Sequence, residues 1–262
     1  MLNDKVSIIT GASSGIGAAL ATLLANEGSL VVLCARRTHM LQNVAARIRN
    51  AGGTCVTIQC DVTNRDAADE MINSMFKLNV FSLWYTTRPA VYYMKKQKSG
   101  HIINIASMAG KLGYPYNSAY VAAKHACVGF THALRLELAE TNVHASVVCP
   151  AGVLTDWASM TEGGSMLPMF SESGSIIKKT AIERNVSLPT IEGVKSAEEV
   201  ARVIIECLYN PVAEVYTHAG SKEFVVLATQ DLETAEQQQI PIALGEREVY
   251  ERLKNSGSHQ AP

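Results

Sequence analysis

The chain has 262 residues, of which 47% are apolar and 18% are charged, and its formal net charge at pH 7 is -1. This near-neutral balance gives no sign of a nucleic-acid partner, and no apolar run approaches the roughly 18 residues that a membrane-spanning helix needs. The length suits one α/β domain, so we predict a single domain over residues 1–262 with a flexible tail at 255–262.

A core-like strand begins within five residues of Met1, which leaves no room for a secretory leader. The six cysteines lie scattered in apolar segments without CxxC spacing, as expected for small core residues in a reducing compartment. We therefore expect a cytoplasmic protein without a metal site and without a membrane or nucleic-acid partner.

Short apolar runs alternate with helical patterns along the first part of the chain. Strands are predicted at 5–10, 30–35 and 54–61, with helices at 18–28, 40–53 and 65–76. The strands are continuous apolar runs rather than alternating ones, which indicates that helices cover both faces of the sheet. This pattern predicts an α/β fold with a doubly wound parallel sheet.

The second part continues the alternation and then breaks it. Further strands are predicted at 101–107 and 144–150, helices at 118–140, 196–210 and 245–255, and a last strand at 222–228. Residues 155–195 instead surround a short apolar island with small and polar residues. A segment this long is either a substrate lid or a mobile surface insertion, and both interpretations remain open.

A glycine-rich stretch, "TGASSGIG", lies between the first predicted strand and the first helix. Glycines at this junction allow a tight turn, and the helix N-terminus offers N–H groups and a positive dipole end to a pyrophosphate. The stretch predicts a dinucleotide site formed by Gly11, Ser13, Ser14, Gly15, Ile16 and Gly17.

The end of the second strand indicates which dinucleotide is preferred. Arg36 and Arg37 stand there after Ala35, where a free ribose would favour a carboxylate. Two arginines that simply face solvent are the alternative, but the pattern favours NADP(H) over NAD(H). Asp61 and Val62, which follow the third strand, are predicted to lie near the adenine ring.

The pattern Tyr-x-x-x-Lys occurs three times, at Tyr92, Tyr120 and Tyr250. Only Tyr120 has a serine thirteen residues upstream, Ser107, at the carboxyl end of a predicted strand, where open α/β sheets bind ligands. A phenol is a poor proton carrier near neutrality, but the charge of Lys124 one turn away favours the phenolate. Ser107 could then hold a substrate oxygen while Tyr120 exchanges its proton.

The motifs "TGASSGIG", "NIASMAG" and "YVAAK" together resemble the classical short-chain dehydrogenase/reductase family over residues 5 to about 155, and weakly over 196–227. The resemblance implies a Rossmann fold and a catalytic set of Ser107, Tyr120 and Lys124. It also implies that Lys124 and Tyr120 contact the cofactor.

Three further positions match the family. Asn79 corresponds to an asparagine that supports a proton-relay water, and Pro150 and Thr155 correspond to residues beside the nicotinamide. Ala151 stands where the family usually has glycine, which is a mild departure.

The interval between Asp61 and Asn79 departs more seriously, because it holds only 17 residues. The family has an additional strand there that ends in "NNAG", so roughly 30 residues, about one β-α unit, are absent. The loss of a central strand leaves either a gap of about 4.8 Å or a sheet whose halves pair directly. Three explanations remain open, in this order of preference. The sequence is an exon-skipped or mis-joined version of an ordinary enzyme, it carries a real deletion in a decayed enzyme, or it is a compact but active variant.

These features predict an NADP(H)-dependent oxidoreductase that interconverts an alcohol and a carbonyl, with a small apolar substrate under residues 156–195. A catalytically impaired form that binds only cofactor or a partner is the alternative. The helices after Asn79 and Asn117 are expected to form a homodimer or homotetramer.

Overall fold

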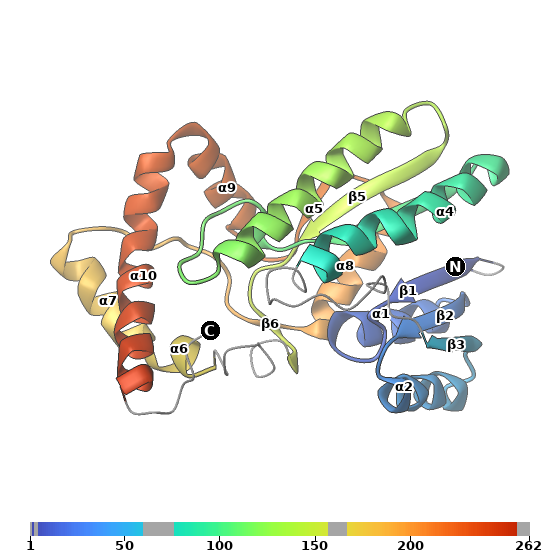
Figure 1. The fold of residues 1–262 in the computed structure, drawn as a ribbon, viewed down its shortest axis with the longest axis horizontal. Coiled ribbons are helices and arrows are strands. Elements are labelled where there is room, and N and C mark those ends of the chain that lie inside the picture. The colour runs from blue at the N-terminus through green and yellow to red at the C-terminus, as the bar shows by residue number, and fades with distance from the viewer. Residues whose placement is uncertain (1, 3–4, 60–75, 157–166, 256–262) are drawn as a thin grey trace. The chain divides into compact units, whose positions relative to one another are not determined.

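The structure is a computed structural model that describes residues 2, 5–59, 76–156 and 167–255. Its first part is a parallel sheet of β1 (Val6–Thr10), β2 (Leu30–Ala35) and β3 (Cys55–Gln59). Val6 aligns with Leu30, and Val31 aligns with Cys55. Helices α1 (Gly15–Asn26) and α2 (Thr38–Asn50) connect these strands (Figure 1).

Both connecting helices cover the same face of this sheet. Ile9, Val31 and Leu33 point from the strands into a cluster with Leu24 of α1 and Leu41 of α2, and all five are buried. Two successive β-α-β crossovers that progress in one direction place their helices on one side of the sheet. The first part of the predicted α/β fold is therefore confirmed.

A second parallel sheet contains β4 (Gly100–Ile105), β5 (Val143–Cys149) and β8 (Glu214–Tyr216). The π-helical turn η1 (Lys77–Phe81) and α4 (Ser82–Gln97) precede β4, and the short turn η2 (Met108–Gly110) and α5 (Ser118–Glu137) lie between β4 and β5. A two-stranded pair, β6 (Val153–Leu154) and β7 (Lys195–Ser196), follows, and then α8 (Ala197–Tyr209).

The second sheet is covered on both faces, as the continuous apolar strands predict. Val143 and Ala145 of β5 pack with Leu134 of α5, whereas Val148 packs with Val200 of α8. Helix α8 also contacts α1, where Ile16 and Leu20 lie against the same cluster as Val200. This contact between helices connects the two sheets.

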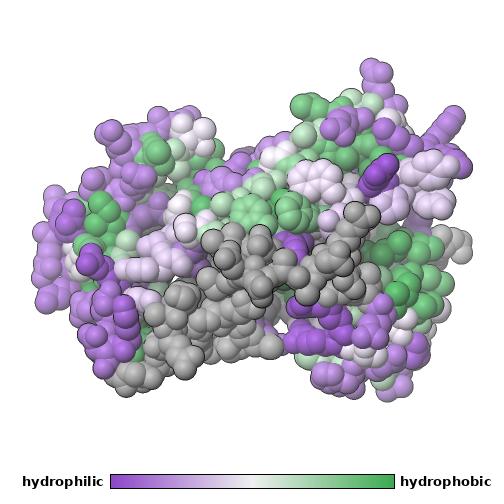
Figure 2. Space-filling model, in the orientation of Figure 1, coloured by the Kyte–Doolittle hydropathy of each residue, from purple (hydrophilic) through white to green (hydrophobic). Residues whose placement is uncertain are grey.

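Within the described ranges, β1 pairs only with β2, and β4 pairs only with β5. Direct re-pairing of the two halves, one of the two expected outcomes of a lost strand, is therefore not found there. The side chains of Val6 and Ile8 are 63% and 68% exposed, on the face of β1 opposite to Ile9. Figure 2 shows apolar surface over this part of the molecule.

Residues 112–118, 156–193 and 218–262 form a second compact unit by their mutual contacts. Its described helices are α6 (Leu167–Glu172), α7 (Gly174–Glu183), α9 (Ser221–Gln230) and α10 (Leu232–Asn255). Helices α7 and α10 approach closely at Gly245, where a Cβ would lie 2.6 Å from Ile177 Cγ1. The expectation of one domain with a lid at 155–195 stays a prediction.

Three local expectations are corrected. The predicted strand at 222–228 is helix α9, because Gly220 turns the chain with φ +79° and adjacent Phe224 and Val225 are both buried, which a strand would not allow. Residues 167–183 form α6 and α7 rather than an irregular segment. The sequence of residues 71–84 predicts one uninterrupted helix, but residues 77–81 form a π-helical turn. None of the described helices is long and apolar enough to cross a membrane.

Candidate functional site

The loop between β1 and α1 has backbone requirements that only glycine meets. Gly11 and Gly15 have φ values of +68° and +54°, in the left-handed region. A Cβ on Gly17 would lie 2.5 Å from the carbonyl oxygen of Gly11. The loop therefore folds back tightly onto the first turn of α1, which also contains Ile16, and presents its backbone closely to any ligand.

The N-terminus of α1 is built to receive an anion. Ser14 is the N-cap residue, yet its side chain makes no capping hydrogen bond, and the first turn holds no acidic residue. The Ser14 hydroxyl instead accepts a hydrogen bond of 2.5 Å from Nη2 of Arg37, which also donates to Ser13 at 3.3 Å. The Arg37 guanidinium thus lies at the N-terminus of α1, and two groups that attract anions stand together. The neighbouring Arg36 is exposed.

Of the two candidate residues that follow β5, Thr155 contacts the glycine loop and Pro150 contacts the turn after β4. Thr155 Cγ2 lies 3.1 Å from the position that a Cβ on Gly15 would take, so Thr155 packs on the glycine loop. The carbonyl of buried Pro150 accepts a hydrogen bond of 2.9 Å from the amide of Met108. Asp61 and Val62, predicted beside the adenine, lie outside the described residues.

Ser107 leaves β4 in an extended conformation and starts turn η2. Its hydroxyl accepts a hydrogen bond of 3.1 Å from the amide of Ala109. The neighbouring amides of Ala106 and Met108 donate to Val148 and Pro150, which continues the β4–β5 ladder past the strand ends. Ser107 is therefore held at the carboxyl edge of the second sheet.

Tyr120 and Lys124 occupy the first two turns of α5. The Lys124 ammonium lies 5.6 Å from the centre of the Tyr120 ring and donates a hydrogen bond of 3.1 Å to the carbonyl of Ile105, the last residue of β4. A Cβ on Gly110 would lie only 2.7 Å from the Lys124 carbonyl oxygen. The structure therefore brings the Ser107 turn against the helix that carries Tyr120 and Lys124.

The remaining candidates lie on other elements. Asn79 is half-buried within the π-helical turn η1. Tyr92, of the first Tyr-x-x-x-Lys pair, lies on α4 with 56% of its surface exposed, although Lys96 approaches its ring to 4.6 Å. Tyr250, of the third pair, stacks on Tyr116. A lysine near a tyrosine ring therefore does not distinguish the Tyr120 pair from the Tyr92 pair. The feature that distinguishes the Tyr120 pair is the contact of its helix with the Ser107 turn.

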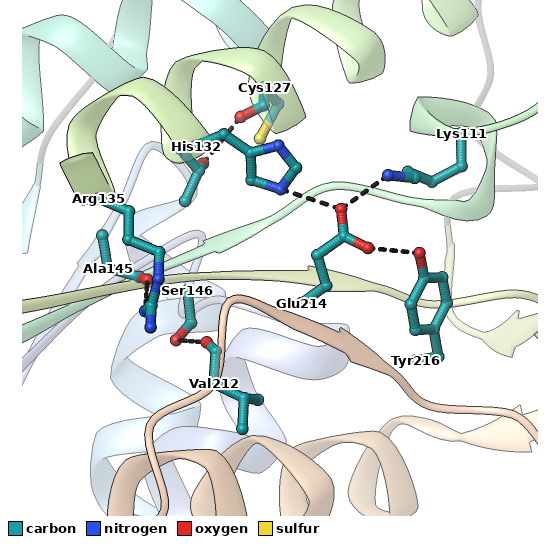
Figure 3. Close-up of polar contacts among 10 residues, drawn as sticks. Lys111, Cys127, His132, Arg135, Ala145, Ser146, Val212, Glu214 and Tyr216 are labelled. Atoms are coloured by element: carbon teal, nitrogen blue, oxygen red, sulfur yellow. Dashed lines mark hydrogen bonds and ion pairs between the residues drawn. The ribbon is translucent and has the colours of Figure 1, made fainter. Parts of the chain in front are cut away.

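A polar cluster beside the Ser107 turn, which we call the Glu214 cluster, was not foreseen from the sequence (Figure 3). Glu214 Oε1 lies 2.7 Å from Lys111 Nζ and 2.9 Å from His132 Nε2, and Glu214 Oε2 accepts a hydrogen bond of 2.5 Å from the Tyr216 hydroxyl. The alternation along "EVY" places Glu214 and Tyr216 on one face, but Lys111 lies 103 residues away.

Ionisation of the Glu214 cluster follows from these contacts. Burial disfavours the charged form of Glu214, but hydrogen bonds from Lys111 and Tyr216 outweigh it and lower the pKa of the carboxyl. Burial and the hydrogen bond to Glu214 raise the pKa of Tyr216. The cluster therefore holds an ionised carboxylate and a neutral phenol at neutral pH.

Taken together, the arrangement combines an anion cradle at the first sheet with a serine hydroxyl, a phenol and an ammonium at the second. Such groups can bind a phosphorylated ligand and exchange a proton with a second molecule. Each of these groups follows the carboxyl end of a strand, the usual ligand edge of parallel sheets.

Comparisons with known proteins agree with this geometry. The sequence profile of the short chain dehydrogenase family matches residues 5–74 and 65–163. The chain is 29% identical to ketoacyl reductase HetN of Nostoc, over 82% of this chain and 78% of that protein. It is 35% identical to an uncharacterized oxidoreductase of Staphylococcus aureus USA300, over 59% of this chain and 80% of that protein.

Solved structures give the same result. A short chain dehydrogenase/reductase of Burkholderia phymatum, in complex with NAD, superposes with a TM-score of 0.70 at 25% identity and covers 88% of this chain and 95% of its own. A variant of actinorhodin polyketide ketoreductase with NADPH gives 0.64 at 26% identity, with coverages of 81% and 95%.

Proposed function

Because the chain belongs to the short chain dehydrogenase family, we propose that it is an NADP(H)-dependent oxidoreductase that interconverts an alcohol and a carbonyl. This proposal depends most on the contact that connects the helix of Tyr120 and Lys124 with the strand that leads to Ser107. Lys124 lies beside the Tyr120 ring and bonds Ile105, two residues before Ser107. Among the described residues, no contact of Lys96 with a strand end is found beside Tyr92, which is exposed on α4.

The residues fit a nicotinamide dinucleotide. The Gly11–Gly17 loop folds tightly because Gly17 has no Cβ to meet the Gly11 carbonyl, and α1 offers an N-terminus without an acidic first turn. Ser13, Ser14 and Ile16 would hold the pyrophosphate, and Thr155 and Pro150 the nicotinamide end, with Asp61 and Val62 at the adenine. When bound, the nicotinamide supplies or accepts the hydride.

Preference for the phosphorylated cofactor is supported by Arg37 and Arg36. Arg37 holds its guanidinium over the loop through Ser14 and Ser13, where a 2'-phosphate on the adenosine ribose would meet a planar donor pair. The two structural relatives contain NAD and NADPH respectively, so the arginines of this chain carry the preference.

The protein's own groups account for the proton. Ser107 holds the carbonyl oxygen of a substrate, and the Tyr120 hydroxyl donates its proton to that oxygen as the carbon is reduced. The Lys124 ammonium lies beside the ring of the phenolate that remains, and Asn79 would support the water that returns the proton. Oxidation of an alcohol runs through the same groups in reverse.

The test is a titration of the purified protein with NADPH and NADH by fluorescence, followed by turnover with a panel of apolar aldehydes and ketones. We expect tighter binding of NADPH. Tyr120→Phe should lower kcat by at least about a thousandfold while leaving NADPH affinity within about twofold, because it removes only the proton donor. Tyr92→Phe, the matched change in the exposed pair, should leave kcat unchanged.

One observation favours a second candidate, a protein that binds cofactor without turnover. In the described part of the chain, the two three-stranded sheets are not paired with each other, and the family profile matches in two segments that overlap at residues 65–74. The alignment with HetN spans 247 positions, more than 82% of 262 residues, so that relative carries residues without a counterpart here. These facts support a missing central unit. Binding of NADPH without turnover, unchanged by Tyr120→Phe, would establish the silent form.

Four further features belong to the proposal. A small apolar substrate, a lid formed by residues 155–195, a homodimer or homotetramer and a cytoplasmic location all follow from the family resemblance and the sequence. Size-exclusion chromatography with light scattering tests the assembly directly.

A further inference from the structure

We propose that Glu214 is a positioning residue that fixes the Ser107 turn and helix α5 relative to each other; its catalytic consequence rests on the proposed function. Glu214 begins β8, and no atom of it is needed in the reaction. Its carboxylate nevertheless contacts Lys111, which ends the turn that Ser107 starts, and His132, which lies on the helix that carries Tyr120 and Lys124.

The Ser107 turn is short, so a contact at its end fixes its beginning. The Gly110 amide donates to the Ser107 carbonyl at 2.8 Å, and the Lys111 amide donates to the Met108 carbonyl at 2.9 Å. Lys111 then extends from the turn to Glu214, on the strand that pairs with β5. Release of the Lys111 side chain would leave the distal end of the turn without its anchor to the sheet.

Helix α5 is attached to the same sheet by contacts along its length. Lys124 bonds the end of β4, Thr131 accepts a hydrogen bond of 2.9 Å from Asn104 of β4, and Arg135 donates to Ala145 of β5. His132 adds the contact with β8 through Glu214. Glu214 is therefore the side chain at which the attachments of the turn and of the helix meet.

The negative charge carries this role. The side chains of Lys111 and Glu214 are only 20% and 21% exposed, so solvent screens their attraction less than that of a surface pair. The hydrogen bond from Tyr216 orients the second carboxylate oxygen and leaves the first for Lys111 and His132. An amide of the same shape would keep hydrogen bonding but lose the attraction for the ammonium.

The experiment compares Glu214→Gln with Glu198→Gln. Glu198 forms an ion pair of 2.6 Å with Arg202 on the exposed surface of α8, so the control removes an equally short pair away from the site. Hydrogen exchange of the peptide that contains residues 107–112 is measured in the full-length protein. We expect the Gly110 and Lys111 amides to exchange about tenfold faster in Glu214→Gln than in the wild type. Their exchange rates in the control variant should equal those of the wild type.

Kinetics separate positioning from general loss of structure. With whichever carbonyl the wild type reduces, Glu214→Gln should lower kcat by about tenfold or more, because small displacements of reacting groups are costly. The dissociation constant for NADPH should change much less than kcat, since the glycine loop, on the other sheet, keeps its contacts with the cofactor. Lys111→Met should act similarly, and the double variant should be no worse than either single one.

The proposal is overturned if residues 107–112 exchange hydrogen at the same rate in Glu214→Gln as in the wild type. It is also overturned if the effects of Glu214→Gln and Lys111→Met on kcat are additive. If the wild type proves silent, faster exchange in Glu214→Gln still supports the positioning role, while the absence of turnover refutes only the proposed enzyme.

Discussion

At the scale of single residues, the site depends on how closely backbones approach one another. Gly17 lies against the Gly11 carbonyl, and Gly110 lies against the Lys124 carbonyl. The first contact shapes the anion cradle, and the second brings the Ser107 turn to the Tyr120 helix. Both glycines are needed for space, whereas the glycines with positive φ are needed for conformation.

Replacement of Gly17 tests this distinction. A Cβ there would lie 2.5 Å from the Gly11 carbonyl oxygen, so the loop would have to shift. Gly17→Ala should therefore lower the free energy of unfolding by about 1–3 kcal/mol and weaken NADPH binding by at least about tenfold. Gly129 lies in α5 with no atom within 4 Å of such a Cβ, so Gly129→Ala should stabilise the protein by about 0.5–1 kcal/mol. Urea unfolding and fluorescence titration measure both; equal effects would contradict the loop geometry.

At the scale of elements, local pattern predicted most strands and the helices between them. Residues 30–35 form β2 as expected, and the glycine loop was found because strand, turn and helix are adjacent in sequence. Ser107 and Tyr120 were chosen by their spacing and their place at a strand end. The run at 222–228 was misassigned because its five consecutive apolar residues suit a strand or a buried helix equally. The Glu214 cluster could not be foreseen, since its members meet only through the tertiary fold.

Helix α10 contains a buried carboxyl that makes stability depend on pH. Burial raises the pKa of Glu246 from 4.5 to about 7. The folded state thus holds this proton more tightly than the unfolded chain, so the free energy of unfolding falls as pH rises from about 4.5 to 7 and the full cost persists above 7. Glu246→Gln should therefore stabilise the protein at pH 8 by up to about 3 kcal/mol and have little effect near pH 4.5.

Urea unfolding at both pH values measures this difference. Glu248→Gln, two residues further along α10 and exposed, is the control and should change stability by less than about 0.5 kcal/mol at either pH. A gain from Glu246→Gln that is the same at both pH values would show that the buried charge is not its cause.

At the scale of the whole molecule, the two described sheets are connected by helices rather than by strand pairing. Ile16 and Leu20 of α1 pack with Val200 and Ile204 of α8, and this contact lies between the sheet that carries the glycine loop and the sheet that carries Ser107. In the proposed enzyme, the glycine loop would hold the pyrophosphate, and Ser107, Tyr120 and Lys124 would act in proton transfer. The α1–α8 contact would then set the distance between these two groups.

The uncovered face of β1 gives a direct test of this arrangement. Ile8 and Ile9 are neighbours on one strand, but Ile8 is 68% exposed and Ile9 is 7% exposed. Ile9→Ala should lower the free energy of unfolding by about 2–4 kcal/mol, whereas Ile8→Ala should cost less than about 1 kcal/mol. Equal costs, measured by urea unfolding, would mean that the face is covered in solution. A cost for Ile8→Ala that grows with protein concentration would identify a second copy of the chain as the cover, because only association depends on concentration.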